Sequence, residues 1–327
     1  MDSAQTPIRM ADPSGHPPGV RASAGRLLAL STAGAWSSVA RLDFAGDRIE
    51  SESLAEPATS GQSARLLSMI GELVEPAQLG GGDGIDAIAF DAGPGAFTGL
   101  RVGCAVAQGL GFARGLPLIP VGSLEAAAWA SVRRTGAGQA VVLVASDARM
   151  GEIYVALCAV QAPQPGALAP SVRLLVAPRV ERPDAAPAAL SRDEIERTMP
   201  ELRGWRWLLA GDALHGLRLD PAWFALAGDA TGSLGLDAAA AADARDVAEL
   251  GLAAWQRGEA VDAALAAPRY VRDKVALDAG EQRRLRESRS AAQAGTAESR
   301  QAGNRESTQA DGQALGQASG GGLSPVR

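Results

Sequence analysis

The sequence predicts an α/β fold built from two similar halves, and three observations predict it. Short apolar runs that are typical of strands alternate with segments of helical periodicity. This mixed order of strands followed by helices occurs twice along the chain. A glycine-rich turn joins a buried strand to a long helix in the first half. The length of 327 residues favours about two domains and is ample to bury a core.

Each element of the first half has a local signal. Residues 26–30 form a short apolar run, which predicts a buried strand. Four apolar residues spaced i, i+4, i+7 and i+8 predict a helix over 63–74. The other elements expected in this half are strands at 38–44, 85–90 and 116–121, a turn at 45–47, a loop at 93–99 and a helix at 99–114.

The second half begins at Ser123, a residue type that favours the N-cap position of a helix. Residues 161–204 are rich in proline and alanine and predict no defined element, while Gly258 is expected to stop the last helix. The elements expected are a helix at 124–131, a hairpin with strands at 140–146 and 152–160 around a turn at 147–151, a strand at 206–210 and a helix at 238–257.

The two ends of the chain have the composition of disordered segments. Prolines crowd residues 1–25, and Gln, Gly, Ser, Ala and Arg dominate residues 278–327, so neither end has the apolar side chains for a core. The chain is therefore divided into a leader at 1–25, a first subdomain at 26–122, a second subdomain at 123–277 and a tail at 278–327. The sequence has no secretory h-region and no membrane-length apolar run, so a cytoplasmic protein with no membrane contact is expected.

Composition excludes several kinds of site. The chain has two histidines, His16 and His215, and two cysteines, Cys104 and Cys158, so a zinc cage is nearly excluded and no metal site is expected. Lys274 is the only lysine and follows no glycine loop, which excludes a Walker-type phosphate loop. The net charge of −6 argues against autonomous binding of nucleic acid. Two cysteines in so long a chain favour a reducing compartment.

The strongest local motif is the segment 86–103, in which a strand enters a Gly-Pro-Gly turn and a helix leaves it. Glycines let backbone N–H groups approach an anion closely, and a helix N-terminus adds partial positive charge. The segment therefore predicts either a phosphate or nucleotide cradle or a tight turn without a ligand. The residues of the candidate cradle are Gly93, Gly95, Thr98, Gly99 and Arg101.

A stripe of small residues follows along the same helix, spaced four residues apart. Each interior glycine costs roughly 1 kcal/mol relative to alanine, so such a stripe predicts that another backbone packs very close. That backbone belongs either to the chain's own sheet or to a helix of a partner. The candidate partner interface combines this stripe with the apolar helix at 63–74 and comprises Leu66, Met69, Ile70, Leu73, Gly99, Gly103, Ala107 and Gly111.

Four motifs in order along the chain resemble those of the TsaB family, also called YeaZ. Residues 85–127 resemble its strand, Gly-Pro-Gly-x-Phe-Thr-Gly-Leu-Arg helix and Ser-Leu-Glu block. The segment with Asp147, Arg149, Glu152 and Tyr154 resembles its Asp-Ala-Arg-x-x-Glu-x-Tyr motif, whose role is unknown. The remaining two matches are Leu-Ala-Gly-Asp at 209–212 and Pro-x-Tyr-x-Arg at 268–272.

This resemblance implies an actin-like ATPase superfamily (ASKHA) fold of two RNase H-like subdomains, each a mixed sheet flanked by helices. It implies a non-catalytic scaffold in the complex that makes threonylcarbamoyladenosine next to the anticodon of tRNA. The implied partners are TsaD as a heterodimer, TsaE, TsaC through its product, and tRNA through the complex. A homodimer of the isolated chain is also implied. No cofactor is expected on the chain alone, while ATP or ADP is expected only at an interface with TsaE.

The chain departs from the family pattern where the first strand ends. The family usually has Asp-Thr-Ser there, and this chain has Ser31 followed by Thr and Ala, which weakens a case for autonomous ATP hydrolysis. A glycoprotease-like or nucleotide-hydrolysing enzyme is the alternative, with the Asp147 motif as its polar site or with Ser31 or Thr98 as nucleophile and His215 as base. A nucleotide-binding switch at the loop 93–99 is a third hypothesis.

Overall fold

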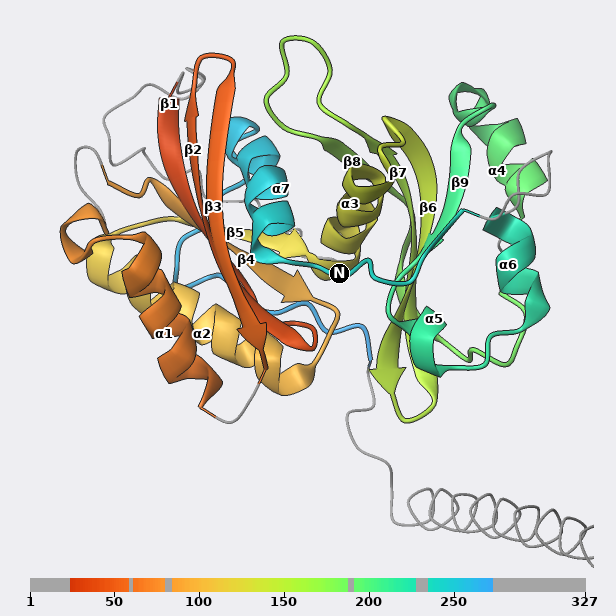
Figure 1. Cartoon of the computed structure of the whole chain (residues 1–327), viewed down its shortest axis with the longest axis horizontal. Helices are drawn as coiled ribbons and strands as arrows, with labels where there is room; N and C mark the ends of the chain where they lie inside the picture. Colours follow the sequence, from red (N-terminus) through yellow and green to blue (C-terminus); the bar gives the residue numbers. More distant parts are fainter. Residues whose placement is uncertain (1–23, 59–60, 80–83, 188–190, 228–234, 273–327) are drawn as a thin grey trace, which may run out of the picture. The chain divides into compact units, whose positions relative to one another are not determined.

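Two five-stranded mixed sheets form the framework of the chain (Figure 1). The computed structural model describes residues 24–58, 61–79, 84–187, 191–227 and 235–272. Residues up to Val271 make one unit, and all the elements named below belong to it. Most of the leader 1–25 and the whole of the tail 278–327 lie outside the described residues.

The first sheet has the strand order β3-β2-β1-β4-β5. Its first three strands pair antiparallel as a meander, after which β4 pairs parallel to β1 and β5 pairs parallel to β4. Strand β4 is buried along its whole length, as expected for a central parallel strand. The strands are β1 (Ala24–Ser31), β2 (Trp36–Ala45), β3 (Arg48–Pro57), β4 (Ala87–Gly93) and β5 (Leu118–Gly122).

The second sheet repeats this topology, with the order β10-β9-β6-β7-β8. Strands β6, β7 and β8 form the antiparallel meander, and β9 and β10 add in parallel. The repeat confirms the predicted α/β fold of two similar halves, each a mixed sheet flanked by helices. The strands are β6 (Gln139–Arg149), β7 (Glu152–Gln161), β8 (Ser171–Glu181), β9 (Arg206–Ala210) and β10 (Leu236–Asp237).

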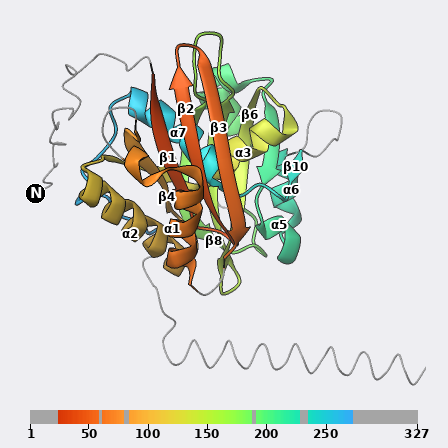
Figure 2. The same ribbon diagram turned by 60° about the vertical axis from the view of Figure 1, so that its left-hand side comes forward.

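Helices cover the sheets in layers, as Figures 1 and 2 show. Helices α3 and α7 lie between the two sheets, while α1 and α2 lie side by side on the outer face of the first. Helices α5 and α6 pack on the second sheet. The helices are α1 (Gln62–Leu73), α2 (Phe97–Arg114), α3 (Ser123–Thr135), α4 (Arg192–Thr198), α5 (Ala213–Gly216), α6 (Pro221–Ala227) and α7 (Ala244–Gln256), with 3₁₀ turns at Pro76–Gln78 and Pro200–Leu202.

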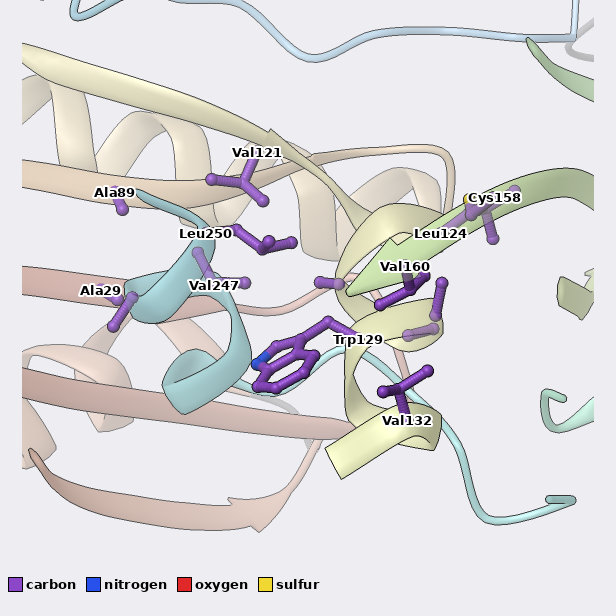
Figure 3. Close-up of a cluster of buried hydrophobic side chains, with 14 of the residues drawn as sticks. Ala29, Ala89, Val121, Leu124, Trp129, Val132, Cys158, Val160, Val247 and Leu250 are labelled. Carbon is purple, nitrogen blue, oxygen red and sulfur yellow. The ribbon is translucent and has the colours of Figure 1, made fainter. Parts of the chain in front are cut away.

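The largest core lies between the sheets and is built around Trp129 of α3 (Figure 3). Its indole packs among aliphatic side chains from both sheets and donates a 2.6 Å hydrogen bond from Nε1 to Glu249 on α7. Arg133, one turn further along α3, donates to both carboxylate oxygens of the fully buried Asp246 at 2.9 and 3.2 Å. These contacts fix the α3–α7 layer, and with it the two sheets, in one arrangement.

The chain returns to the first sheet after finishing the second. Helix α7 packs on β1, β2, β4 and β5, and Val261 pairs with Leu118 at the edge of β5. Ala263 and Ala266 enter the core beneath α1 and α2. Residues 244–271 therefore pack with the first sheet, whereas the predicted division assigned everything from 123 to 277 to the second subdomain.

Most predicted elements are present, with small shifts at their ends. The hairpin of β6 and β7 is confirmed, and its two-residue loop is Met150–Gly151 with positive φ at both residues. The last helix begins at Ala244 and not at 238, because the side chain of Asp243 caps the N–H groups of the first turn.

Three predictions were wrong or incomplete. Strand β3 had not been predicted, and strand β8 and helix α4 lie in the region from which no element was predicted. Ser123 is the first residue of α3 and not its N-cap. Its hydroxyl instead accepts a hydrogen bond from the N–H of Gly93 at 3.0 Å, so it joins α3 to the end of β4. Within the described ranges, no helix is long and apolar enough to cross a membrane.

The role of the α3–α7 layer predicts the effect of removing one hydrogen-bond donor. Trp129→Phe leaves Oε2 of Glu249 buried without the indole N–H, so the free energy of unfolding is expected to fall by about 2–3 kcal/mol in urea titrations. Trp255→Phe, a change of the same kind on the half-buried indole of α7, is the control and is expected to cost under about 1 kcal/mol. Equal losses in both variants would contradict this role.

Candidate functional site

A buried carboxylate at the end of β4 holds the turn that follows β1. Both oxygens of Asp91 accept from the N–H of Thr32, at 3.0 and 3.1 Å. Oδ2 also accepts from the N–H of Ala33 and from the hydroxyl of Ser31, each at 2.8 Å. Asp91 is completely buried, so these donors from one turn replace water as its partners.

Burial dominates the electrostatics of Asp91. Loss of hydration raises the pKa of this carboxyl to about 6, although the hydrogen bonds from Ala33, Ser31 and Thr32 act in the opposite direction. All of the donors that face it are neutral groups of its own chain. The first strand lacks the acid of the family pattern, and the nearby acid is Asp91 on β4. The oxygens of Asp91 face the turn that follows β1.

The glycines of α2 and of the loop before it pack on this same turn. A Cβ on Gly95 would lie 2.6 Å from the Cβ of Ala33. A Cβ on Gly99 would overlap the carbonyl oxygen of Thr32, and one on Gly103 would overlap its hydroxyl. Thr32 closes the contact by donating its hydroxyl to the carbonyl of Gly99 at 2.9 Å. The backbone that the small stripe requires is therefore the chain's own.

The candidate anion cradle is filled by internal contacts. The N–H of Gly93 donates to Ser123, and the N–H of Ala96 donates to the carbonyl of Ala33 at 2.8 Å. A Cβ on Gly93 would lie 2.8 Å from the carbonyl oxygen of Arg269, so this glycine makes room for the returning C-terminal segment. The loop geometry is that of a tight turn between packed elements. Thr98 and Arg101, the other two predicted cradle residues, are exposed on the outer side of α2.

The predicted interface residues lie inside the chain, which corrects that part of the hypothesis. Leu66, Met69, Ile70 and Leu73 of α1 are at most 4% exposed. The small residues of α2 are also buried, and a Cβ on Gly111 would lie 3.0 Å from that of Ala263. Spacing revealed a close backbone contact but not which backbone made it. All eight residues lie on the buried sides of α1 and α2, so they are unavailable for direct contact with a partner.

The opposite faces of α1 and α2 enclose an apolar groove of about 580 Å³. Leu67 is 49% exposed and Phe97 is 38% exposed, which is unusual for such large apolar side chains. The groove is lined by Ser63, Leu67, Phe97, Thr98, Arg101, Val102, Ala105, Val106, Gly109 and Leu110. An apolar groove between two neighbouring helices suits a partner helix or apolar side chains better than a charged ligand.

One end of the groove is shaped by a cation–π cluster. The Arg101 guanidinium lies 3.8 Å from the ring centre of Phe97 and donates from Nε to the Tyr270 hydroxyl at 3.0 Å. The rings of Phe97 and Tyr270 are 5.6 Å apart. Tyr270 belongs to the closing Pro-x-Tyr-x-Arg motif, so the cluster brings together two motifs that are 169 positions apart in sequence. Arg and aromatic residues of this kind are the side chains that carry most energy in protein interfaces.

The Asp147 motif is a closed turn at the tip of the β6–β7 hairpin. Asp147 accepts from the backbone N–H of Arg149 at 2.7 Å and from its guanidinium at 3.0 Å. Asp212, from the Gly-Asp turn, accepts from the hydroxyl of Ser146 and the N–H of Asp147. Tyr154 packs against the central core, and Glu152 lies opposite Arg149 in the strand register of the hairpin. These contacts account for the motif as a capped, charge-paired turn.

The residues considered for catalysis or metal binding have other surroundings in the described part of the chain. There, no group of three or more His, Cys, Asp or Glu side chains is placed to hold a metal ion. The hydroxyl of Ser31 is buried against Asp91, and His215 is exposed on α5. Both cysteines are buried, and burial raises the pKa of each thiol.

Two features of the site were missed from the sequence. Asp91 stood within the quoted motif, but an acid that ends a strand before Gly-Pro-Gly looks like an ordinary turn residue. The groove residues repeat at helical spacing on the face opposite the glycines, so helical periodicity read outward from the stripe would have found them.

The glycine packing predicts opposite effects for two alanine substitutions on one helix. Gly99→Ala places a Cβ on the Thr32 carbonyl and is expected to lower the free energy of unfolding by at least about 3 kcal/mol. Gly109→Ala meets no atom within 4 Å and is expected to raise it by up to about 1 kcal/mol through helix propensity. Denaturant titrations measure both; a tolerated Gly99→Ala would disprove the contact.

The raised pKa of Asp91 predicts a pH dependence with a definite sign. The folded chain binds a proton at Asp91 more tightly than the unfolded chain, so the stabilising contribution is present below about pH 4 and is lost as pH rises to about 6. Relative to Asp91→Asn, the stability of the wild type is expected to fall by up to roughly 3 kcal/mol over this range. Urea titrations of both proteins at pH 4, 5, 6 and 7 test this. A constant or rising difference would contradict it.

Comparison with known proteins places this geometry in a family. Residues 56–164 match the family described as TsaD: tRNA N6-adenosine threonylcarbamoyltransferase. A Haemophilus influenzae protein named tRNA threonylcarbamoyladenosine biosynthesis protein TsaB is 42% identical over 128 residues, which are 39% of this chain and 51% of that protein. The protein of the same name from Escherichia coli is 42% identical over 90 residues, 28% of this chain and 38% of the relative. The chain thus spans about half or less of the curated relatives it matches.

Solved structures extend the match to the full length of two relatives. A Pseudomonas aeruginosa structure described as an uncharacterized protein with similarity to peptidase YEAZ is 32% identical, with a TM-score of 0.57, and the match covers 76% of this chain and 100% of that one. A second structure, YeaZ from the same organism, is 31% identical with a TM-score of 0.56 and is covered to 99%, against 75% of this chain. With the fold, the ordered motifs and these full-length matches in agreement, the chain belongs to the TsaB/YeaZ family.

Proposed function

We propose that this chain is an accessory subunit in the biosynthesis of threonylcarbamoyladenosine in tRNA. The curated relatives carry that process in their names, and the family match to TsaD covers the segment from the end of β3 to just beyond β7. The chain would act by binding a catalytic partner and not by transferring a group itself. The observation that carries the proposal is the apolar groove between the outer faces of α1 and α2.

The groove supports TsaD as the partner that docks there. Its walls are almost entirely apolar, and the Arg101–Phe97–Tyr270 cluster supplies an aromatic and guanidinium anchor at one end. The inner face of α2 is rigidly packed on its own turn, so the groove is preformed and little ordering cost opposes docking. In the absence of TsaD, two copies of this chain would cover the same face as a homodimer.

A non-catalytic role is supported by what surrounds the candidate chemical groups. Asp147 is paired with Arg149, the Ser31 hydroxyl is held by Asp91, and the loop N–H groups of Gly93 and Ala96 are used internally. We further propose that TsaE joins on the assembled pair, with ATP or ADP bound at that composite interface. TsaC would supply the activated threonylcarbamoyl group, and tRNA would bind the complete assembly.

The docking proposal predicts the effect of one charge placed in the groove. Ala105→Glu puts a carboxylate on the exposed groove wall, and burying that charge against an apolar partner is expected to weaken TsaD binding at least tenfold. Ala113→Glu makes the same change at an exposed position of α2 that does not line the groove, and it should bind like the wild type. Isothermal titration with purified TsaD measures both affinities.

The same pair of variants tests the process in cells. When each replaces the native gene, Ala105→Glu is expected to lower the threonylcarbamoyladenosine content of tRNA, while Ala113→Glu maintains it. Full tRNA modification and unchanged TsaD affinity with Ala105→Glu would refute the groove as docking site. Normal modification after complete loss of the chain would refute the proposed process itself.

A further inference from the structure

We propose that Asp91 is a positioning residue that sets the first two turns of α2, and thereby the shape of the groove wall, through the turn at Ser31–Thr32–Ala33. The inference rests on the proposed docking function only for its consequence in binding. Its structural part stands on the contacts of Asp91 and Thr32 alone.

One turn supplies the hydrogen-bond donors that face Asp91. A carboxylate that is 0% exposed accepts from two successive backbone N–H groups and one hydroxyl. Successive N–H groups turned to one point form a concave anion site, and here that site holds the chain's own carboxylate. The turn is therefore fixed by an internal anion. Its N–H groups are not available to an external phosphate.

Two hydrogen bonds join the fixed turn to the start of α2. Thr32 donates to the carbonyl of Gly99 at 2.9 Å, and the N–H of Ala96 donates to the carbonyl of Ala33 at 2.8 Å. Gly95, Gly99 and Gly103 lack side chains where the turn presses on them, so loop and helix meet the turn at backbone contact. Any displacement of the turn must then displace the start of α2.

The same two turns of α2 also carry part of the proposed docking face. Phe97, Thr98, Arg101 and Val102 lie on the opposite side of the same two helical turns and form one end of the groove. Phe97 and Arg101 also make the cluster with Tyr270. The carboxylate on β4 and the partner-facing side chains are thus linked by two hydrogen-bonded contacts through the turn. Asp91 acts on the groove without touching it.

Asp91→Asn is the direct test, because an amide offers one acceptor where the turn presents donors, and its NH₂ group opposes them. Thr32→Val is a milder second variant that keeps shape and removes the bond to Gly99. Asp237→Asn is the matched control, a carboxylate-to-amide change at a buried acid of the second sheet, which bonds the N–H of Ala239 and the guanidinium of Arg134 and not the turn. Backbone hydrogen–deuterium exchange over residues 96–103 and TsaD affinity at 10 °C and pH 7.5 are measured in each.

The expected result is exchange at least tenfold faster over residues 96–103 in Asp91→Asn, with TsaD affinity reduced at least tenfold. Thr32→Val should show a smaller acceleration at the same amides, and it carries the test if Asp91→Asn does not fold. Asp237→Asn should leave both readouts within twofold of the wild type. Unchanged exchange in both turn variants, or equal acceleration in the control, would overturn the proposal. If the wild type does not bind TsaD, the docking function fails while the exchange data still decide the role of Asp91.

Discussion

The contact between one buried carboxylate and one short turn organises the first half of this protein. Asp91 draws Ser31, Thr32 and Ala33 onto the end of β4, and the turn so fixed becomes the surface on which α2 is laid. Three glycines let the loop and helix approach that surface to backbone distance. A small change in the turn therefore has consequences along two turns of helix, far from the acid itself.

Helix α2 has two faces with different physical roles. Its inner face is small, buried and intolerant of a single added methyl group, because the space that a Cβ needs is taken by Thr32. Its outer face is apolar and open, and with α1 it forms the groove. A rigid inner face is useful to a docking surface, since a preformed wall loses little conformational entropy when a partner binds.

The sequence was most informative where local chemistry and long-range packing agree. The β6–β7 hairpin was predictable because two apolar runs flank a turn that contains a capping Asp147 and Gly151 at positive φ. Strand β3 was not, because an edge strand with one neighbour can carry Glu and Ser along its exposed face and lose its apolar signal. Likewise, the glycine spacing of α2 revealed close packing but could not identify the contacting segment. That segment is the turn at Thr32, some 70 positions earlier in the chain.

The surface proposed to meet the partner is the outer face of α2 and not its glycine face. Cysteine labelling tests this directly, because both native cysteines are buried. A maleimide should label Ala105→Cys and Ala113→Cys in the isolated chain at a concentration at which it is monomeric, both positions being exposed on α2. With TsaD bound, labelling is expected to be at least tenfold slower at position 105 and unchanged in rate at 113. Equal labelling of position 105 with and without bound TsaD would contradict it.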